Sequence, residues 1–361
     1  MGTVGLMSRV LRGAASVAEP TLDVTREQIV AFRRRTGALD ERLPPGPASL
    51  VRAAWAGLQD SVPRSALHSL HARVGMTAPD AWDDPSLVQV WGLRYTAYVV
   101  PAGDHAPFTL GRLPDDGRTR RVAEDLAARL QDYLQGRRLD ANEVGRGLGI
   151  HPNALRYAAM TGTVLIRWDG VRRPTVWTVP RPELEPLTAR IELARRYLRT
   201  FGPTTPGSFA TWAGIKPRAA LAAFDALGSS LVTARTPIGK AFVLAADEPT
   251  LRASAGPPAS ARLLPSGDPY YLLRGVDREL LVPDPGHRAA LWTSRVWPGA
   301  LLVGGDIAGT WRRSGAVVTV QPWRRLSREE RDAVELEAST LPLPEVHGAV
   351  AVRWGSTDPA R

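Results

Sequence analysis

The chain contains no cysteine and, among its 361 residues, only two lysines, Lys216 and Lys240. The absence of cysteine excludes disulfide bonds, thiolate zinc sites and a cysteine nucleophile. The two lysines are the only side-chain amines that could form a Schiff base. Thiol chemistry is therefore excluded, and amine chemistry has two candidates.

Long apolar runs are also missing, because no run approaches the roughly 18 residues that span a membrane. The N-terminal apolar patch is interrupted by Arg9 and Arg12, which is unlike a secretory signal. We therefore expect a cytoplasmic protein without membrane contact, and we expect residues 1–20 to form a disordered extension. An apolar content of 44% in a chain of this length suffices for two or three small domains.

The chain has six histidines, of which only His68 and His71 lie close together in sequence. On a helix the two would share a face, but no acidic residue accompanies them at the spacing of a third metal ligand. We expect both to be packing or surface residues. The sequence thus predicts neither a metal nor a cofactor.

The formal net charge is +10, and nearly all of the positive charge comes from arginine. Such a charge favours a polyanionic partner such as nucleic acid, whose phosphates dominate binding affinity. A GC-rich genome would produce the same composition without such a partner. The architecture therefore has to decide between the two explanations.

An internal repeat relates residues 133–152 to residues 197–217 at an offset of 64 to 65 positions. In each copy an amphipathic helix ends near a glycine, a second short helix follows, and Gly-Ile-X-Pro leads into a third helix. Two pairs of β-type runs follow the helices: 163–168 with 175–179, and 231–233 with 241–245. Three helices and a two-stranded ribbon are typical of the winged helix.

The N-terminal part of the chain has the same order of predicted elements. A capping-box pattern at residues 25–28 begins a helix that runs to residue 36. Two helices, at 48–56 and 63–74, and a strand at 88–100 follow. We therefore predict a third unit of the same kind.

Beyond residue 253 a linker at 254–260 precedes short β-type runs. These runs lie at 270–273, 279–282, 300–303 and 316–320, and a helix at 328–339 follows them. The sequence therefore predicts an α+β fold of three tandem winged-helix units followed by a small β-rich C-terminal domain. The predicted limits are 21–120, 121–182, 183–252 and 261–361.

A polar triplet, Gln59, Asp60 and Ser61, lies in the turn before the third helix of the first unit. That helix is predicted to begin at Pro63, a favoured first residue of helices. If the helix docks on DNA, the side chains of the turn lie near a sugar or a base edge. The triplet is therefore the candidate catalytic site.

Several fragments, in order, resemble the AlkZ-like (YcaQ-like) family of tandem winged-helix DNA glycosylases over about residues 25–343. The fragments are 57–59, 63–67, 90–96, 201–203, 263–265, 268–270 and 309–312. The resemblance implies an enzyme that removes bulky N7-alkylated purines. Some members of the family unhook crosslinks, and many confer self-resistance to genotoxic natural products.

The catalytic motif of that family is glutamine, an apolar residue, then glutamine or aspartate. Gln59 matches the first position, whereas Asp60 replaces the apolar residue and Ser61 the last one. The family usually has a histidine two residues after the threonine of its Arg-X-Thr segment, where this chain has Tyr98. The resemblance makes Gln59 the expected water-positioning residue.

N7-alkylation makes a purine cationic and a good leaving group, so the enzyme has to stabilise positive charge on the sugar and hold a water near C1′. A glutamine carbonyl can orient that water, and Asp60 or Ser61 can assist. Three alternatives stay open. Ser61 can be an N-cap, Asp60 a solvated turn residue or helix-dipole anion, and Gln59 a phosphate contact.

The expected partner is double-stranded DNA carrying a lesion, bound by a monomer associated with the nucleoid. Arginines near predicted helix ends and wings are the expected DNA contacts. They are Arg33, Arg34, Arg35, Arg64, Arg156, Arg172, Arg173, Arg312 and Arg313. Lys216 and Lys240 are far in sequence from the turn, which predicts a monofunctional enzyme without lyase activity.

Two other functions are compatible with the sequence. One is a non-catalytic DNA-binding protein, either a regulator or a lesion sensor, on a scaffold whose motif has diverged. The other is a protein that sequesters a DNA-reactive metabolite. Gln59 favours the enzyme, whereas Ser61 and Tyr98 favour the binding proteins.

Overall fold

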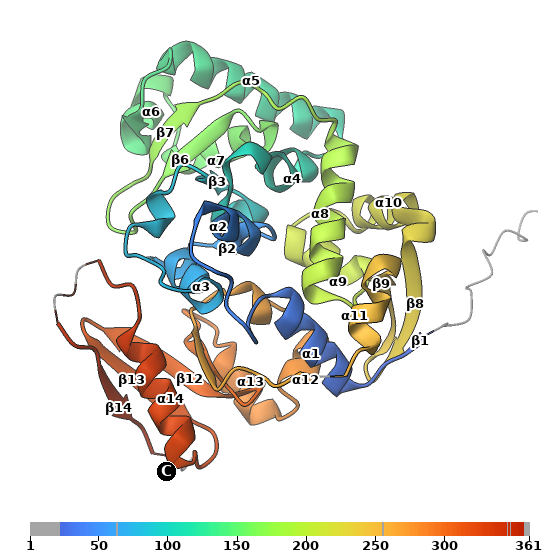
Figure 1. Ribbon diagram of the computed structural model, residues 1–361. Coiled ribbons are helices and arrows are strands. Elements are labelled where there is room, and N and C mark those ends of the chain that lie inside the picture. Colours follow the sequence, from blue (N-terminus) through green and yellow to red (C-terminus); the bar gives the residue numbers. More distant parts are fainter. Residues whose placement is uncertain (1–21, 63, 255, 345, 347, 357–361) are drawn as a thin grey trace, which may run out of the picture.

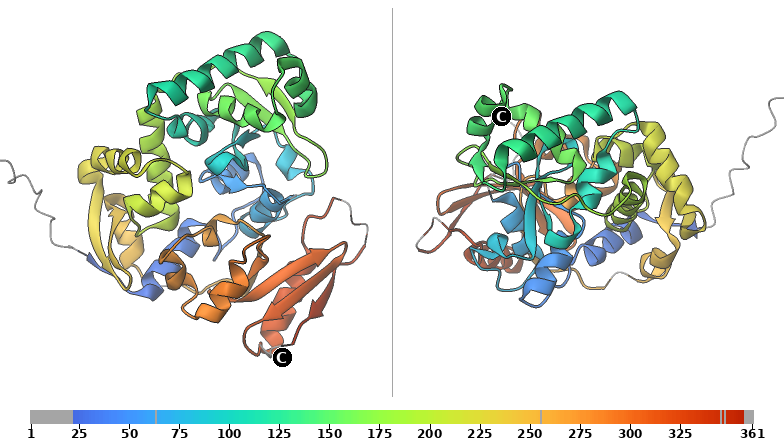
Figure 2. Two further views of the ribbon diagram at one scale, coloured as in Figure 1. Left: turned by 180° about the vertical axis from the view of Figure 1, so that it is seen from behind. Right: turned by 90° about the horizontal axis from the view of Figure 1, so that it is seen from above.

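Three β-sheets, with helices packed around them, organise this α+β protein (Figure 1). The computed structural model describes residues 22–62, 64–254, 256–344, 346 and 348–356. The predicted disordered extension at 1–20 lies outside these residues. Figure 2 shows the same arrangement from behind and from above, with the C-terminal sheet at one end.

Both copies of the internal repeat have the predicted order of three helices and an antiparallel strand pair. The first copy consists of α5 (Gly117–Leu134), α6 (Ala141–Leu148), α7 (Leu155–Ala158), β6 (Val164–Arg167) and β7 (Thr175–Thr178). The second consists of α8 (Pro186–Phe201), α9 (Pro206–Ala213), α10 (Pro217–Leu227), β8 (Leu231–Thr236) and β9 (Gly239–Leu244). Glycines in the left-handed conformation, Gly149 and Gly214, end the middle helix of each copy.

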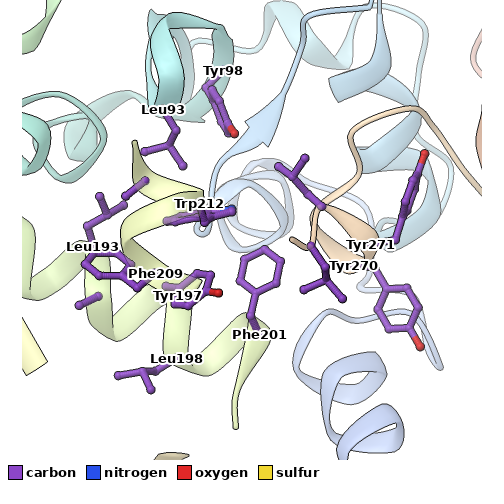
Figure 3. Packing of buried hydrophobic residues seen from close by; sticks show 14 of the residues in the cluster. Leu93, Tyr98, Leu193, Tyr197, Leu198, Phe201, Phe209, Trp212, Tyr270 and Tyr271 are labelled. Atoms are coloured by element: carbon purple, nitrogen blue, oxygen red, sulfur yellow. The ribbon is translucent and has the colours of Figure 1, made fainter. Parts of the chain in front are cut away.

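Aromatic packing holds α8 against α9 (Figure 3). The ring of Tyr197 lies 4.9 Å from that of Trp212 and 4.8 Å from that of Phe201, centroid to centroid. All three side chains are almost fully buried in the largest apolar cluster. Such aromatic contacts add to the free energy that burial alone supplies, and here they fix the angle between two helices of the second copy.

The N-terminal segment forms α1 (Arg26–Thr36), α2 (Pro47–Ala54) and α3 (Ser65–Arg73), close to the predicted bounds. The capping box at Thr25 is present. The single strand predicted at 88–100 is wrong, because the chain forms two antiparallel strands there, β3 (Leu87–Trp91) and β4 (Ala97–Pro101). Positive φ angles at Arg94 and Tyr95 make the tight turn between them, which the apolar pattern did not reveal.

The predicted units share sheets across their limits. One six-stranded sheet has the order β2 (Leu58–Gln59), β4, β3, β6, β7 and β5 (Leu139–Asp140), so it continues past residue 120. In addition, β1 (Leu22–Asp23) pairs in parallel with β8, and Ile29 and Phe32 of α1 pack with Val243. Residues 22–36 therefore pack on the second copy of the repeat, and the predicted limits do not separate independent cores.

A five-stranded sheet dominates the C-terminal region. Its strands are β10 (Ala261–Leu264), β11 (Gly299–Val303), β12 (Asp306–Ser314), β13 (Val317–Pro322) and β14 (Ala351–Trp354). The helix α14 (Arg328–Ser339) has the predicted bounds. Shorter helices among the described residues are α4 (Ala106–Thr109), α11 (Glu248–Arg252), α12 (Asp277–Leu281) and α13 (Pro285–Leu291).

The strands predicted at 270–273 and 279–282 are wrong. Residues Pro269–Tyr271 form a 3₁₀ turn, and the second run lies in α12. Short apolar runs fit a buried strand and a buried helical turn equally well. Here Tyr270, Tyr271 and Leu281 turn into the largest core cluster, so tertiary packing decided their conformation.

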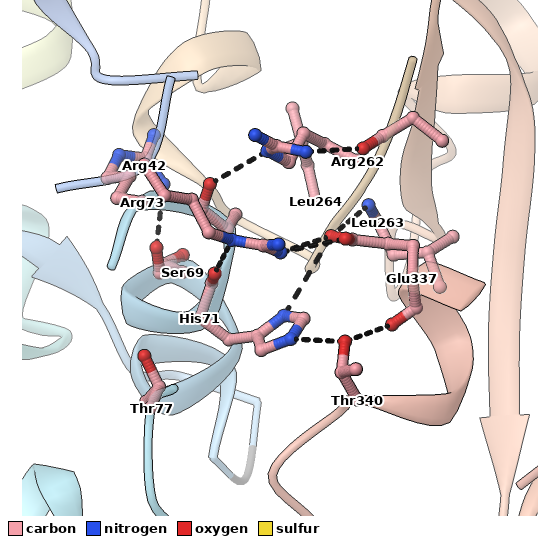
Figure 4. Close-up of polar contacts among 12 residues, drawn as sticks. Arg42, Ser69, His71, Arg73, Thr77, Arg262, Leu263, Leu264, Glu337 and Thr340 are labelled. Atoms are coloured by element: carbon pink, nitrogen blue, oxygen red, sulfur yellow. Dashed lines mark hydrogen bonds and ion pairs between the residues drawn. The ribbon is translucent and has the colours of Figure 1, made fainter. Parts of the chain in front are cut away.

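A buried ion pair joins α3 to the loop after β10. Arg73 donates two hydrogen bonds, of 2.7 and 2.8 Å, to the carboxylate of Asp268, which also accepts one from the Ser69 hydroxyl. His71 of α3 contacts Thr340, and Arg42 binds Glu337 of α14 (Figure 4). These contacts tie the helix after the polar triplet to the C-terminal sheet.

We expect Arg73→Met to lower the free energy of unfolding by about 3–5 kcal/mol, because it leaves the buried Asp268 carboxylate without its counter-charge. Arg120→Met is the matched control, since Arg120 pairs with Glu124 on the surface of α5 and such pairs contribute about 0–1 kcal/mol. Urea unfolding measures both. Equal effects of the two substitutions would contradict a special role for the buried pair.

Candidate active site

The polar triplet begins in β2 and continues into the turn before α3. Gln59 is paired with Tyr98 of β4, and alternate side chains of an extended strand point to opposite faces. Gln59 and Ser61 accordingly face outward, whereas Asp60 is buried. The sheet register therefore places Gln59 and Ser61 on the outer side of the strand and Asp60 on the inner side.

Hydrogen bonds on both sides hold the amide of Gln59. Its Oε1 accepts from the guanidinium of Arg94 at 3.0 Å and from the hydroxyl of Tyr98 at 3.3 Å. Its Nε2 donates to Oγ of Ser61 at 2.5 Å. The opposite amide orientation would set the NH₂ group against a cation, so this network assigns the carbonyl to Arg94. Burial raises the pKa of Tyr98, which keeps its hydroxyl a donor.

Both carboxylate oxygens of Asp60 are occupied inside the fold. Oδ1 accepts from the backbone N–H of Ala66 in the first turn of α3, at 3.0 Å, and Oδ2 accepts from Nε2 of Gln89 at 2.6 Å. The side chain is 2% exposed. Asp60 is therefore the anion at the helix N-terminus, and the expectation that it faces the substrate is wrong. The N-cap alternative for Ser61 is also wrong, because Arg64 occupies that position.

A pocket of about 550 Å³ opens beside Gln59, and we call it the main pocket. Ser61 and Gly267 also line it, and the backbone of Gly267 approaches so closely that a Cβ there would lie 3.2 Å from Nε2 of Gln59. Four arginines line it as well: Arg94, Arg274, Arg278 and Arg295. No aspartate or glutamate is among the described residues of this lining, so the main pocket favours anionic groups such as phosphates.

Two further pockets adjoin the main pocket. One is lined by Arg156, Arg172 and Arg173 and shares Ser61 and Thr96 with the main pocket. The other contains Arg312 and Arg313. The three pockets form a row around the Gln59 turn, and we call this row the basic groove.

Comparisons with known proteins identify the family. A model of the AlkZ-like DNA glycosylase family matches residues 53–341. The chain belongs to the AlkZ-like DNA glycosylase family. Its fold is similar to the solved structure of the Streptomyces sahachiroi DNA glycosylase AlkZ, with a TM-score of 0.75 and 20% identity over 92% of this chain and 100% of that one. A search of curated proteins found no match.

Membership in the family supports DNA glycosylase activity and implies binding to DNA. Five of the predicted DNA contacts lie in the basic groove of this AlkZ-like glycosylase: Arg156, Arg172, Arg173, Arg312 and Arg313. Arg172 and Arg173 are exposed in the loop between β6 and β7.

Two of the predicted DNA contacts on α1, Arg33 and Arg34, are wrong, whereas Arg35 stays a prediction. Arg33 is 1% exposed and donates to the carbonyls of Phe201 and Gly202 at the end of α8. Arg34 is also buried and binds the carboxylate of Asp40. Arg35 is half-buried and donates to backbone carbonyls near α11. Arg33 thus satisfies carbonyls at the end of α8 that would otherwise lack partners. The buried guanidiniums of Arg33 and Arg34 are therefore not available to phosphates.

Arg64 stays a prediction as a DNA contact. Its guanidinium lies over the ring of Trp82, 3.6 Å from the centroid. Sequence reasoning missed Arg94, Arg274, Arg278 and Arg295, which line the main pocket together with Gln59. The segment 90–96, part of the family resemblance, was a signal for Arg94. No comparable signal marked the other three, because the folding of distant loops brings them together.

The two neighbouring histidines differ in their surroundings. His71 contacts Thr340 and Glu337, and His68 lines one of the pockets. Across the part of the chain that the structure describes, no three histidine or acidic side chains are grouped as metal ligands would be. The described helices also include none that is both long and apolar enough to span a membrane.

The buried carboxyl of Asp60 makes stability depend on pH. Burial raises the pKa of Asp60 to about 6 from an ordinary value of 3.8, against the opposing effect of its hydrogen bonds. The folded state therefore binds this proton more tightly than the unfolded state does. The contribution of the protonated Asp60 carboxyl to the free energy of unfolding is complete below about pH 4, and it is lost as the pH rises through about 6.

We expect Asp60→Asn to remove this dependence. Between pH 4 and pH 7 the unfolding free energy of the wild type should fall relative to that of the variant, by about 1.4 kcal/mol for each unit of difference in pKa. Urea unfolding at several pH values measures the difference. Asp132→Asn, on the exposed face of α5, is the control and should track the wild type. A constant gap between the wild type and Asp60→Asn would refute the expectation.

Proposed function

We propose that this AlkZ-like glycosylase hydrolyses the N-glycosidic bond of bulky N7-alkylated guanine in duplex DNA and leaves an abasic site. The observation that carries the proposal is the amide of Gln59, held by Arg94, Tyr98 and Ser61 at the centre of the basic groove. Such an activity serves genotoxin self-resistance or crosslink repair.

The chemistry demands little of the protein, because the alkylated base already carries a positive charge. As the bond between C1′ and N9 breaks, its electron pair neutralises the base, and a water oxygen forms the new bond to C1′. The attacking water gives up one proton to the solvent, because the departing base is already neutral. Preorganised dipoles that hold the water and the sugar are the main contribution that a protein can make.

Ser61 is the side chain of the triplet best placed to hold that water. The Gln59 carbonyl already accepts two hydrogen bonds, whereas Ser61 Oγ accepts one, from Gln59. A hydroxyl oxygen has a second lone pair and its own proton to offer. Gln59 thus orients Ser61, and it contacts the water itself when the long bond from Tyr98 opens. Asp60 acts as a positioning residue beneath the turn.

The two lysines support a monofunctional reaction. Lys216 lies at the start of α10, where it contacts Asp116, and Lys240 lies in β9. Neither lysine lines the main pocket, so no lysine amine stands at the sugar to form a Schiff base. Strand incision by the purified protein, without added lyase or base, would contradict this assignment.

The arrangement of helices supports a winged-helix mode of DNA binding. Each copy of the repeat places a third helix next to a strand pair, which is the layout of a winged helix. The loop between β6 and β7, in the wing position of the first copy, carries Arg172 and Arg173 into the basic groove. An open groove accepts a large lesion more readily than a closed base pocket does.

Gln59→Ala should lower the rate of excision by about 10²-fold or more, because it removes the group that orients Ser61 and the water. Ser61→Ala should lower it less, by about tenfold, because the Gln59 amide that Ser61 no longer occupies can then contact the water directly. Single-turnover excision from a duplex with one bulky N7-guanine adduct measures both rates. Gln131→Ala, on the exposed side of α5, is the control and should react like the wild type.

Tight lesion binding without excision by the wild type would instead support the non-catalytic DNA-binding protein. An unchanged excision rate in Gln59→Ala would show that the reaction does not depend on this turn. Affinity is therefore measured on the same duplex in parallel. Wild-type affinity together with slow excision is the result expected for Gln59→Ala.

Replacing both Arg172 and Arg173 by alanine should weaken binding to undamaged and damaged duplexes alike. The salt dependence should also become shallower, by about one unit of slope for each phosphate that the variant no longer binds. Fluorescence anisotropy at several salt concentrations measures the slope. Arg252→Ala is the control, since Arg252 lies on α11 and pairs with Glu248. An unchanged slope in the double variant would exclude this loop from the DNA interface.

A further inference from the structure

The pocket of the basic groove that contains Arg312 and Arg313 has a volume of about 280 Å³ and adjoins the main pocket. We call it the side compartment. Val62, Ser266, Val296 and Trp297 line both spaces and form their common wall. The rest of its lining comes from α3, from Pro265 after β10, from Pro298 and Gly299 at the start of β11, and from β12. A base held beside Gln59 therefore lies next to this compartment.

The side compartment has a buried polar group without a partner. His68 of α3 is 5% exposed, and its Nε2 makes no hydrogen bond within the described part of the chain. An unsatisfied buried nitrogen is costly in free energy, and a ligand that binds it recovers that cost. Burial, reinforced by the charge of Arg313, lowers the pKa of His68 to about 3. The imidazole is therefore neutral and offers one donor and one acceptor.

Two tryptophans contribute flat apolar surfaces to the lining. Trp311 is fixed by a hydrogen bond from its Nε1 to the carbonyl of Leu264, at 2.8 Å. The indole lies so close to β11 that a Cβ at Gly299 would be 2.2 Å from that nitrogen. Trp297 stands in the common wall. Flat walls of this kind suit a planar ring, which stacks on aromatic faces.

Charge narrows the choice of ligand further. Arg312 and Arg313 line the side compartment and are exposed. The described lining includes no carboxylate. A cationic group is therefore disfavoured, and a neutral or anionic group is accepted.

We propose that the side compartment receives a planar aromatic substituent carried by the damaged base, and that His68 hydrogen-bonds to a polar atom of that substituent. The inference rests on the proposed function, because it assumes an adducted base beside Gln59. It adds the chemical class of the lesion: an aromatic adduct, neutral or anionic, with a hydrogen-bonding group.

The test measures equilibrium binding of duplexes that differ only at one guanine. The N7 substituent is methyl, benzyl or 3-acetamidobenzyl, and a 2′-fluoroarabinose at the lesion prevents hydrolysis. The wild type should bind both aromatic adducts about tenfold more tightly than the methyl adduct, and the acetamido adduct most tightly, since about 1.4 kcal/mol corresponds to each tenfold.

Two variants separate the hydrogen bond from the space. His68→Phe keeps a ring but removes both nitrogens, so it should lose about fivefold in affinity for the acetamido adduct and nothing for the benzyl adduct. His68→Trp fills the compartment. Its affinity for both aromatic adducts should therefore fall to its affinity for the methyl adduct. His71→Phe makes the same change three residues along α3, outside the side compartment, and should leave all ratios unchanged. Thermal unfolding checks each variant, and His68→Phe decides if His68→Trp does not fold.

Equal affinity of the wild type for the three adducts overturns the inference. So does an equal loss on all three duplexes in the His68 variants, since that pattern indicates a merely structural histidine. Excision from the same duplexes with ordinary deoxyribose is measured separately. Failure of the proposed function appears there as an absence of excision, whereas the binding ratios report the side compartment in either case.

Discussion

The geometry of the site depends on the buried carboxylate of Asp60. One oxygen binds the N-terminus of α3 and the other binds Gln89, which in turn binds both backbone groups of Trp168 at the end of β6. A single side chain thus joins the turn, α3 and two strands. With Asp60 turned inward, the alternation of the strand sends Gln59 and Ser61 outward into the basic groove.

The motif of the family has an apolar residue where this chain has Asp60. Burial destabilises the charged form of an ionisable group at that position, and this desolvation raises the pKa of Asp60. Hydrogen bonds from a helix N-terminus and an amide offset much of it. The replacement of the apolar motif residue by Asp60 is therefore structural, because it changes which hydrogen bonds hold the turn. Gln59 and Ser61 still occupy the outward-facing positions.

Arginine has two separate roles in this protein. Arg33, Arg34 and Arg73 are buried and bind carbonyls or carboxylates that connect distant segments. Those around Gln59 face a groove without acidic partners in its described lining, and there they favour phosphates. Sequence position did not distinguish the two groups, because a guanidinium at the end of an amphipathic helix serves either purpose. The run Arg33 to Arg35 resembled a DNA-binding surface, but Arg33 and Arg34 proved to be internal.

The sequence by itself determined the helices and strand pairs of the repeat, the helix α14 and the outward position of Gln59. Capping residues, glycines and apolar periodicity act over a few residues, so a linear pattern contains them. Only the tertiary structure decided that the run 88–100 is two strands, that Asp60 is buried, and that Arg274, Arg278 and Arg295 surround the Gln59 turn. These features depend on contacts between residues far apart in the chain, and local patterns do not encode which distant segments meet.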